Sequence, residues 1–385
     1  MRILHTSDWH LGRHFHGQGM LAHQAAYADH LIDTIDAASV DLVVVSGDVY
    51  DRALPPVDAV ALADETFARL AASRARVVLT SGNHDSARRL GFNARLVDAA
   101  GFHIRTVADA VATPVLLDDE HGTVAVYGIP YLEPDLVRRP WDLPARSHQA
   151  ALLEATTRIR ADLATRPRTR SVVLAHAFVA GGRPTDSERD ISVGGVSLVA
   201  ASTFDRFDYV ALGHLHGRQT ITDAVRYSGS PLAYSFSEAD HVKGSWLVDL
   251  DARGNVAAEF VDAPVPRRLA RLTGTLDDLL ADARHTAAEH AWVQATLTDV
   301  VRPAQAMARL QERFPHTVAL VFAPAGGDPA RPRVRLEGRS DQEVAVDFVA
   351  AVRGTPATGA ETALIREACD ACVADPDADV VVSAT

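Results

Sequence analysis

The sequence predicts an α/β protein built on a parallel sheet, and two observations carry this prediction. Short, almost wholly apolar segments alternate with amphipathic stretches of helical period, and clusters of Asp, His and Asn directly follow several of the apolar segments. Open α/β sheets place their functional sites at the carboxyl ends of such strands. The chain has 385 residues, enough for more than one domain, and its 47% hydrophobic and 23% charged residues are typical of a globular protein.

The first two thirds of the chain repeat the strand–helix alternation. The run 41–45 is nearly all apolar, as expected of a strand covered on both faces. Apolar residues recur at helical spacing within 20–38. The predicted strands are 3–6, 41–45, 76–80, 124–129, 171–175 and 209–212, with two more flanking the turn Ser228–Pro231, and the predicted helices are 20–38, 56–72 and 147–163.

A domain boundary is predicted at Pro264–Pro266, so that residues 1–265 form a first domain. Residues 266–338, here called the capping domain, are predicted to form a smaller α+β unit in the order β-α-β-α-β. Its second helix is expected to begin at Pro303, because proline is favoured at the first helical position. The predicted elements are strands 269–273, 292–297 and 318–322 and helices 276–284 and 303–313.

Residues 339–385 are predicted to form a helical hairpin. Ser340–Glu343 and Thr358–Glu361 each have the pattern of a capping box that opens a helix. Val344, Phe348 and Val352 form an apolar stripe on the first helix. Such a hairpin either packs on its own domain or docks on another protein, and both alternatives stay open. Cys369 and Cys372, the chain's two cysteines, lie in the second helix, where a packing role is favoured.

Five fragments supply candidate metal ligands. Their carboxylates, amide and imidazoles suit manganese, iron or zinc and would make a poor calcium site. Two such ions would attract a phosphodiester and lower the pKa of water at the site towards neutrality. Asp48, at the tip of a central strand, is the natural bridging ligand, and the glycines before Asp48, Asn83 and His214 let the backbone turn. The fragments are Asp8-x-His10, Gly47-Asp48-x-x-Asp51, Gly82-Asn83-His84-Asp85, His176 and Gly213-His214-x-His216.

Together with further segments, these fragments resemble the calcineurin-like metallophosphoesterases and, among them, the SbcD-type nucleases, bacterial counterparts of the Mre-type break-repair nucleases. The further segments are Asp8–Arg13, Gly82–Ser86, Ser187–Asp190, Tyr227–Leu232 and Ser235–Glu238. The resemblance implies a two-layered β sandwich flanked by helices. It also implies two divalent metal ions, with Mn²⁺ expected. One ion would be held by Asp8, His10, Asp48 and His216, and the other by Asp48, Asn83, His176 and His214.

The same resemblance places His84 beside the scissile phosphate. Asp51 stands where archaeal relatives carry a second catalytic histidine, so a catalytic role and a loop-capping role both stay open for it. The implied activity is 3′–5′ exonuclease cleavage of double strands and endonuclease cleavage of single strands and hairpins, in DNA end processing during repair, recombination and replication. The candidate DNA contacts are Arg13, His16, Arg88 and Arg89.

The implied partner is an SbcC-type coiled-coil ATPase that binds the C-terminal hairpin, with a homodimer inside a heterotetramer. The formal net charge of −12 excludes a generally basic surface, so DNA must be held by local arginines, metal or this partner. The start of the chain does not have the pattern of a signal peptide, and no apolar run approaches the roughly 20 residues that span a bilayer. Two cysteines make no disulfide framework. The cytoplasm, with association to the nucleoid, is therefore the expected location.

Two other functions compete with the nuclease. Gly47–Arg52 resembles a phosphoprotein phosphatase pattern, although Ala53 stands where that pattern has Gly. Another phosphatase or small phosphodiesterase is therefore the first rival. The second is a non-catalytic adaptor whose metals only support a binding surface. The intact His84 and the complete set of ligand positions favour an enzyme.

Overall fold

The computed structural model describes residues 1–192, 198–324 and 339–374. Two compact units divide the chain, Met1–Ala325 and Gly326–Thr385, and each is considered by itself. The end of the expected capping domain and the last residues of the expected hairpin lie outside the described residues. The three-part division at 265 and 338 stays a prediction. None of the helices in the described ranges is long and apolar enough to cross a membrane.

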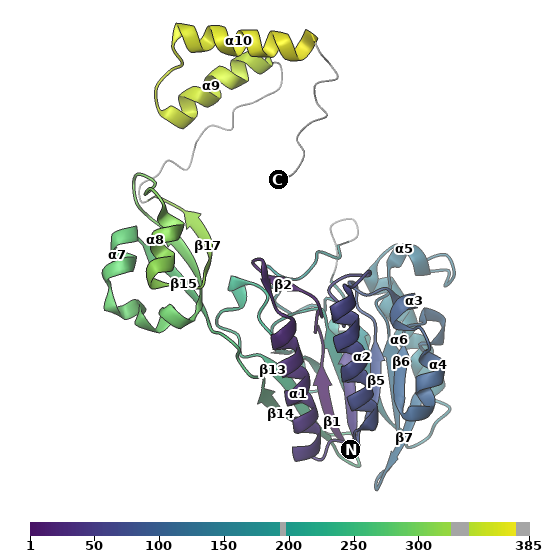
Figure 1. The fold of residues 1–385 in the computed structure, drawn as a ribbon. Coiled ribbons are helices and arrows are strands. Elements are labelled where there is room, and N and C mark those ends of the chain that lie inside the picture. Colours follow the sequence, from purple (N-terminus) through teal and green to yellow (C-terminus); the bar gives the residue numbers. More distant parts are fainter. Residues whose placement is uncertain (193–197, 325–338, 375–385) are drawn as a thin grey trace. The chain divides into compact units, whose positions relative to one another are not determined.

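The first unit contains two six-stranded sheets (Figure 1). In the first sheet, of order β14-β13-β1-β4-β5-β6, the strands β1, β4, β5 and β6 run parallel, and β13 pairs antiparallel with both β1 and β14. These strands are β1 Arg2–Thr6, β4 Leu42–Ser46, β5 Arg76–Thr80, β6 Phe102–Arg105, β13 Gly244–Leu250 and β14 Val256–Asp262.

The second sheet has the order β11-β12-β10-β9-β8-β7, with β8, β9, β10 and β12 parallel and antiparallel strands at both edges. Its strands are β7 Val115–Asp119, β8 Gly122–Ile129, β9 Arg170–His176, β10 Tyr209–Gly213, β11 Gln219–Thr220 and β12 Val225–Tyr227. The parallel strands in the centre of both sheets therefore correspond to the apolar runs predicted from the sequence.

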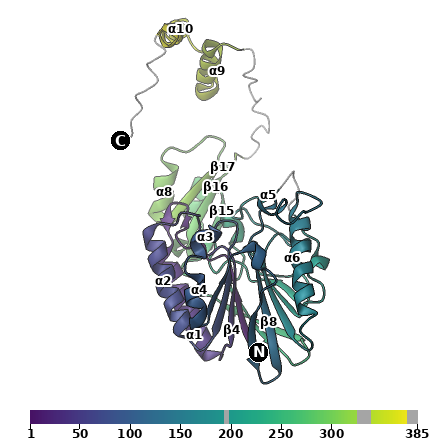
Figure 2. The same cartoon turned by 90° about the vertical axis from the view of Figure 1, so that its right-hand side faces the viewer.

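The two sheets pack face to face, and helices cover their outer faces. Figure 2 shows α1 (Leu21–Ala37) and α2 (Val57–Ala72) on one side and α6 (His148–Leu163) on the other. Strand β4 shows why its sequence is apolar throughout. Val44 lies in the core between the sheets, whereas Val43 and Val45 lie in the core under α1 and α2. This arrangement confirms the expected β sandwich flanked by helices.

Shorter elements connect these layers. A two-stranded hairpin, β2 and β3, follows the first strand, and several short helical turns lie in the loops. They are β2 His14–Phe15, β3 Gln18–Gly19, α3 Ala87–Leu90, α4 Ala94–Val97, α5 Pro134–Val137 and the 3₁₀ turns η1 Asp98–Ala100, η2 Ala108–Ala110, η3 Ala201–Phe204 and η4 Phe236–Glu238.

The described part of the capping domain is a three-stranded parallel sheet, of order β15-β16-β17, with two helices and its own apolar core. The helix expected from Pro303 begins instead at Ala306, because Gln305 adopts left-handed φ of 51° and interrupts the helical path. The helix expected to reach residue 284 ends at Ala281, and a 3₁₀ segment follows. The elements are β15 Leu269–Gly274, α7 Leu276–Ala281, η5 Ala283–His290, β16 Trp292–Leu297, α8 Ala306–Arg313 and β17 Thr317–Phe322.

An aromatic cluster joins the capping domain to the loops beside the sandwich. Trp292, at the start of β16, packs against Phe15 of the β2–β3 hairpin, with ring centroids 5.1 Å apart, and the same cluster includes Phe236 of η4. Arg271 of β15 also forms an exposed ion pair with Asp240, just after η4. The segment around η4 therefore contacts both domains.

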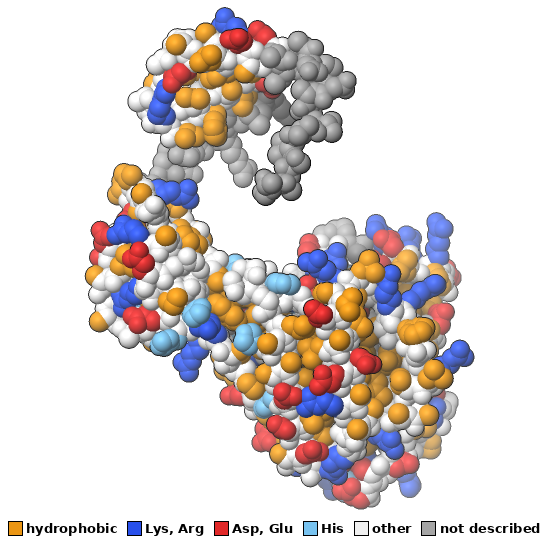
Figure 3. Space-filling model, viewed as in Figure 1, with side chains coloured by type: hydrophobic (Ala, Val, Ile, Leu, Met, Phe, Trp, Pro, Cys, Tyr) orange, Lys and Arg blue, Asp and Glu red, His pale blue; other side chains and the backbone are white. Residues whose placement is uncertain are grey.

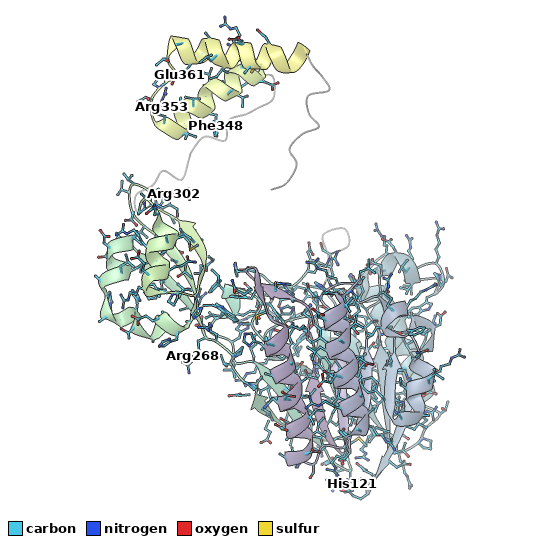
Figure 4. All side chains as sticks on the ribbon, in the orientation of Figure 1. His121, Arg268, Arg302, Phe348, Arg353 and Glu361 are labelled. Atoms are coloured by element: carbon cyan, nitrogen blue, oxygen red, sulfur yellow. The ribbon has the colours of Figure 1, made fainter. Side chains whose placement is uncertain are left out.

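The second unit contains the predicted hairpin, made of α9 (Asp341–Arg353) and α10 (Gly359–Ala374). The Ser340–Glu343 capping box is formed as expected, and Gly354 ends α9 with φ of 77°. Arg353 and Glu361 join the two helices by hydrogen bonds of 2.6 and 2.9 Å (Figure 4). Cys369 is half-buried on α10, and the side chain of Cys372 lies outside the described residues.

Candidate metal centre

The loops after five parallel strands meet at one rim of the two sheets. Asp8 follows β1, Asp48 follows β4, Asn83 and His84 follow β5, His176 ends β9, and His214 and His216 follow β10. Three overlapping groups have their ligand atoms within 4.8 Å of one another: Asp8, His10 and His216; His10, Asp48 and His84; and Asp8, Asp48 and His176. Five of the seven expected ligands belong to these groups, and the other two, Asn83 and His214, lie beside them, because Asn83 Oδ1 is 2.9 Å from His176 Nε2 and 3.2 Å from His214 Nδ1. The expected ligands therefore lie together at the edge that the strand order predicts.

The backbone at this rim is strained. Asp8, His10, Asp48 and His214 have positive φ values of 55°, 47°, 50° and 104°. A left-handed conformation costs a residue other than glycine about 1–3 kcal/mol, and such residues gather at functional sites. The loops are therefore shaped to aim these four side chains at a common point, at some expense of stability.

The glycines that precede the ligands have different structural roles. Gly47, before Asp48, has φ of 87° and makes the sharp turn expected from the sequence. At Gly213 the interpretation as a turn is wrong, because this residue is the last of β10 and its φ is not in the left-handed region. A Cβ atom there would lie 1.9 Å from the backbone oxygen of Ser46. Glycine is needed at this position so that strands of the two sheets can approach each other.

The first cluster of ligand atoms surrounds His10 Nε2. This atom lies 3.0 Å from His216 Nε2 and 3.6 Å from Asp48 Oδ2. Two neutral imidazole lone pairs repel at such a distance, so the arrangement requires either a shared proton or a cation. The Nδ1 atom of His10 is buried and has no hydrogen-bond partner among the described residues.

The second cluster surrounds Asn83 Oδ1. His176 Nε2 lies 2.9 Å and His214 Nδ1 lies 3.2 Å from this oxygen, and Asp48 Oδ2 is 3.5 Å from His176 Nε2. The Nδ1–H of His176 donates to the backbone oxygen of Ser46 at 2.9 Å, which leaves the Nε2 lone pair directed into the site. Asp48 Oδ2 is thus shared between the two clusters.

Electrostatics at the rim favour bound cations. Burial raises the pKa of Asp8 to about 7, and burial together with the neighbouring Asp85 and Asp8 carboxylates holds the pKa of Asp48 well above its usual range. Burial lowers the pKa of His176 to about 3 and that of His214 well below its usual value. Divalent cations would compensate the buried carboxylates and bind the neutral imidazoles, so the residues present fit a dimetal site.

His84 lies beside both ligand clusters but is not one of the seven expected ligands. Its Nδ1–H donates to the backbone oxygen of Asp51 at 2.8 Å, and its Nε2 lies 4.0 Å from Asp48 Oδ2. The Asp51 carboxylate is 3.6 Å from His10 Nδ1 and 4.0 Å from His84 Nδ1. Asp51 therefore touches His84 through its main chain, and its carboxylate is at the edge of the site.

The sequence alone assigned no role to Asp85, whereas its contacts in the structure indicate a structural role. Its carboxylate accepts backbone N–H groups from Val49 at 3.2 Å, Tyr50 at 2.9 Å and Gly82 at 2.9 Å. These bonds tie the loop of Asp48 to the loop of Asn83. Asp85 thus holds two ligand loops in register.

The candidate DNA contacts differ in their surroundings. Arg13 is largely buried: Nη2 donates to the backbone oxygen of Ser187 at 2.7 Å, and the guanidinium lies over the ring of Tyr234. His16, Arg88 and Arg89 are exposed. Arg189, which the sequence did not single out as a DNA contact, is also exposed and lies near enough to His84 to help lower the pKa of that imidazole.

Two packed sheets gather Asp, Asn and His side chains at a shared rim, and this arrangement fits a metallophosphoesterase. Residues 1–218 match the family model of the calcineurin-like phosphoesterases, and the chain belongs to this family. Residues 265–353 match the model of the SbcD C-terminal domain, described as the type 5 capsule protein repressor C-terminal domain. The chain is therefore an SbcD-type member of the calcineurin-like family.

Two solved structures are also similar to the chain. TT1561 of Thermus thermophilus is 13% identical, with a TM-score of 0.40, and the match covers 67% of this chain and 98% of that one. GAP50, the anchor in the inner membrane complex of Plasmodium, is 12% identical, with a TM-score of 0.40, covering 86% of this chain and 99% of that one. The family assignment rests on the two family models.

Proposed function

We propose that this protein is a metal-dependent DNA nuclease that processes DNA ends in repair, recombination and replication. The observation that carries the proposal is the position of Asp48 Oδ2, 3.6 Å from His10 Nε2 and 3.5 Å from His176 Nε2. One carboxylate oxygen is thereby available to two sets of ligands, as a two-metal phosphoester hydrolase requires. The SbcD-type C-terminal match favours DNA as the substrate over a phosphoprotein or a small phosphodiester.

The proposed cofactors are two divalent cations, with Mn²⁺ expected. Asp8, His10, Asp48 and His216 would hold one, and Asp48, Asn83, His176 and His214 would hold the other. When bound, these cations polarise the phosphate and lower the pKa of water.

His84 is proposed as the residue that protonates the leaving group. Water attacks the phosphorus and gives up one proton to the solvent, the bond from phosphorus to O3′ breaks, and the His84 Nε2 proton passes to that oxygen. Burial lowers the pKa of His84, and the anionic substrate beside Nε2 would favour the protonated ring. The backbone oxygen of Asp51 fixes the ring by accepting its Nδ1–H, which is the role proposed for Asp51.

Local cations would hold the DNA, since the formal net charge is −12. His16, Arg88 and Arg89 stay as proposed contacts, and Arg189 joins them because it is exposed and near His84. For Arg13 the inward hydrogen bond to Ser187 supports a role in fixing the loops around the site rather than a direct contact with phosphate.

Cleavage of defined DNA by the purified full-length chain tests this function. Linear duplex labelled at either 5′ end, duplex with both ends blocked, and a hairpin are incubated with Mn²⁺ or with a chelator, with and without an SbcC-type ATPase and ATP. We expect Mn²⁺-dependent 3′–5′ shortening of the free duplex and opening of the hairpin. Hydrolysis of a phosphopeptide with DNA left intact would identify the phosphatase instead, and no hydrolysis of any substrate would identify the adaptor.

The C-terminal hairpin is proposed to dock on the coiled-coil ATPase. Phe348, Val352 and Leu364 have relative exposures of 65%, 70% and 65%, and Figure 3 shows hydrophobic side chains gathered on these helices. An apolar surface of this kind on a two-helix unit suits a helical partner. We expect a homodimer that carries two ATPase subunits, a stoichiometry that the mass of the complex in solution measures.

Phe348→Asp should weaken ATPase binding by about 10- to 100-fold, because it places a charge in the proposed apolar contact. Mn²⁺-dependent cleavage without the ATPase should be unchanged. Pull-down and calorimetric titration with the ATPase measure the effect. Leu136→Asp, at a leucine on α5 that is 73% exposed, is the matched control. Equal binding by the Phe348 variant and the wild type would exclude this surface.

A further inference from the structure

Lys243 stands out in both sequence and structure. The chain contains 38 lysine and arginine residues, and Lys243 is the one lysine among them. It lies directly before β13 with 8% relative exposure, whereas long basic side chains are almost always exposed. A chain that uses arginine at every other basic position has an ammonium group at one buried position.

The surroundings of this ammonium suit its shape. Nζ donates to the backbone oxygen of His216 at 2.7 Å, to Ser230 Oγ at 3.0 Å and to Glu238 Oε2. An ammonium has three donors on one compact, tetrahedral centre, and here each donor has an acceptor. The planar guanidinium of arginine is larger and has its five donors in a fixed fork, so it would not reproduce these bonds.

Glu238, in turn, links the ammonium of Lys243 to the hydroxyl of Ser187. Its side chain is fully buried, and Oε1 accepts the Ser187 hydroxyl at 2.6 Å and the Tyr234 backbone N–H at 3.2 Å. Because the Ser187 hydroxyl donates to Glu238, its oxygen is left to accept the Nδ1–H of His216, at 2.6 Å. Lys243, Glu238, Ser187 and His216, here called the Lys243 network, are thus connected in one line.

Other contacts fix the main chain of His216. Its N–H donates to Glu188 Oε1 at 2.7 Å, and its carbonyl oxygen accepts Ser230 N–H at 3.2 Å in addition to the ammonium. With Nδ1 protonated and bonded to Ser187, the Nε2 lone pair points towards His10 Nε2, 3.0 Å away. By contrast, His10 Nδ1 has no hydrogen-bond partner in the described ranges. The Lys243 network therefore holds the imidazole of His216, on one side of the first ligand cluster, in a fixed orientation.

We propose that Lys243 and Glu238 are positioning residues that act through Ser187 to orient His216, and that they set the affinity of one metal of the pair. The affected ion is the one assigned to Asp8, His10, Asp48 and His216, so the inference rests on the proposed function. Hydrogen-bond partners of metal-binding histidines contribute 10- to 100-fold in metal affinity. The other ion, assigned to Asn83, His176 and His214, has a separate support, the bond from His176 to Ser46.

Calorimetric titration of the metal-free, full-length protein with MnCl₂ tests the proposal. The variants are Lys243→Met, Lys243→Arg, Glu238→Gln and, as the least disruptive break in the network, Ser187→Ala. We expect two sites in the wild type. In each variant one site should weaken by about 10- to 100-fold, while the other changes by less than about threefold. Arginine should not restore the affinity, because its geometry differs from that of the ammonium.

A matched control distinguishes positioning from general destabilisation. Arg170 and Asp119 form another buried ion pair, on β9 and β7, at the opposite ends of those strands from the metal-binding rim. Arg170→Met should lower the unfolding temperature as Lys243→Met does, yet leave both manganese affinities unchanged. Wild-type affinities in the Lys243, Glu238 and Ser187 variants, or an equal loss in the Arg170 variant, would overturn the proposal.

The single lysine also offers a spectroscopic test. Selective ¹⁵N-lysine labelling gives one side-chain resonance, and diamagnetic Zn²⁺ should shift it in the wild type and much less in Ser187→Ala. A resonance that zinc leaves unmoved would contradict the network. Two manganese sites without any DNA cleavage would overturn the nuclease proposal alone, and a wild type without two sites would overturn both.

Discussion

Asp48→Asn should make the metal-free protein more stable and, at the same time, abolish its hydrolytic activity. Asp48 has 2% relative exposure, and burial and the Asp85 and Asp8 carboxylates keep its pKa well above the usual range. Its ionised form therefore costs folding free energy unless cations are bound, so the amide should stabilise the metal-free state by about 1–3 kcal/mol. Loss of the bridging carboxylate should slow DNA cleavage by at least roughly 10³-fold, about 4 kcal/mol.

The stability gain of Asp48→Asn should depend on pH in a defined direction. The folded-state pKa of Asp48 is raised, so its unfavourable contribution is present above that pKa and fades as pH falls to about 4, where both folded and unfolded chains bind the proton. Urea unfolding with a chelator at pH 8 and pH 4 measures this. We expect a clear gain at pH 8 and little difference at pH 4.

Asp85→Asn provides the contrasting control for this prediction. Burial raises the pKa of Asp85 to about 6, but this carboxylate, unlike that of Asp48, accepts three backbone N–H groups on its two oxygens. An amide would place an NH₂ donor against these N–H groups in place of one acceptor oxygen, and the lost bonds should outweigh the relief of the buried charge, so this variant should be less stable at pH 8. If Asp48→Asn were destabilising at pH 8, or still bound two manganese ions and cut DNA, the role of Asp48 as shared ligand would be wrong.

His84→Gln should reduce DNA cleavage by about 10²–10⁴-fold while leaving manganese binding intact. The imidazole lies at the edge of both ligand clusters, with Nδ1 bonded to Asp51 and Nε2 4.0 Å from Asp48 Oδ2. Glutamine fills similar space, but it cannot deliver a proton to the leaving oxygen. Single-turnover cleavage with saturating Mn²⁺ measures the chemical step, and calorimetry measures metal binding.

His121→Gln is the control histidine. His121 lies in the turn between β7 and β8, at the far end of the strands from the metal-binding rim (Figure 4), and this change should alter neither rate nor affinity. Cleavage by the His84 variant at the wild-type rate would remove His84 from the mechanism. Loss of a manganese ion in that variant would reassign it as a ligand.

Much of the fold could be predicted because its central strands have strong local signals. β4, β5, β9 and β10 are buried on both faces, so their sequences are continuous apolar runs. The hairpin helices carry their own capping boxes and were predicted at nearly the observed positions. These signals reside within a few consecutive residues, which is why the sequence alone reveals them.

Other elements had no such signal. Strand β14, at the edge of the first sheet, is only partly buried and its apolar residues are interrupted by Glu259, and β11 has two residues, so neither forms a continuous apolar run. The start of α8 depended on the left-handed backbone of Gln305, a residue with no special preference for that conformation. In these places packing against neighbouring elements decides the structure, and local sequence does not reveal it.

The sequence by itself determined which side chains reach the rim, because a ligand directly after a parallel strand has only one edge of the sheet to occupy. Only the tertiary structure decided how those side chains are held. The bonds from His216 to Ser187, from Ser187 to Glu238 and from Lys243 to His216 join residues 29, 51 and 27 positions apart. No spacing along the chain encodes such contacts, because the packing of separate loops brings the polar atoms together and thereby fixes the nitrogen that each imidazole offers to a metal.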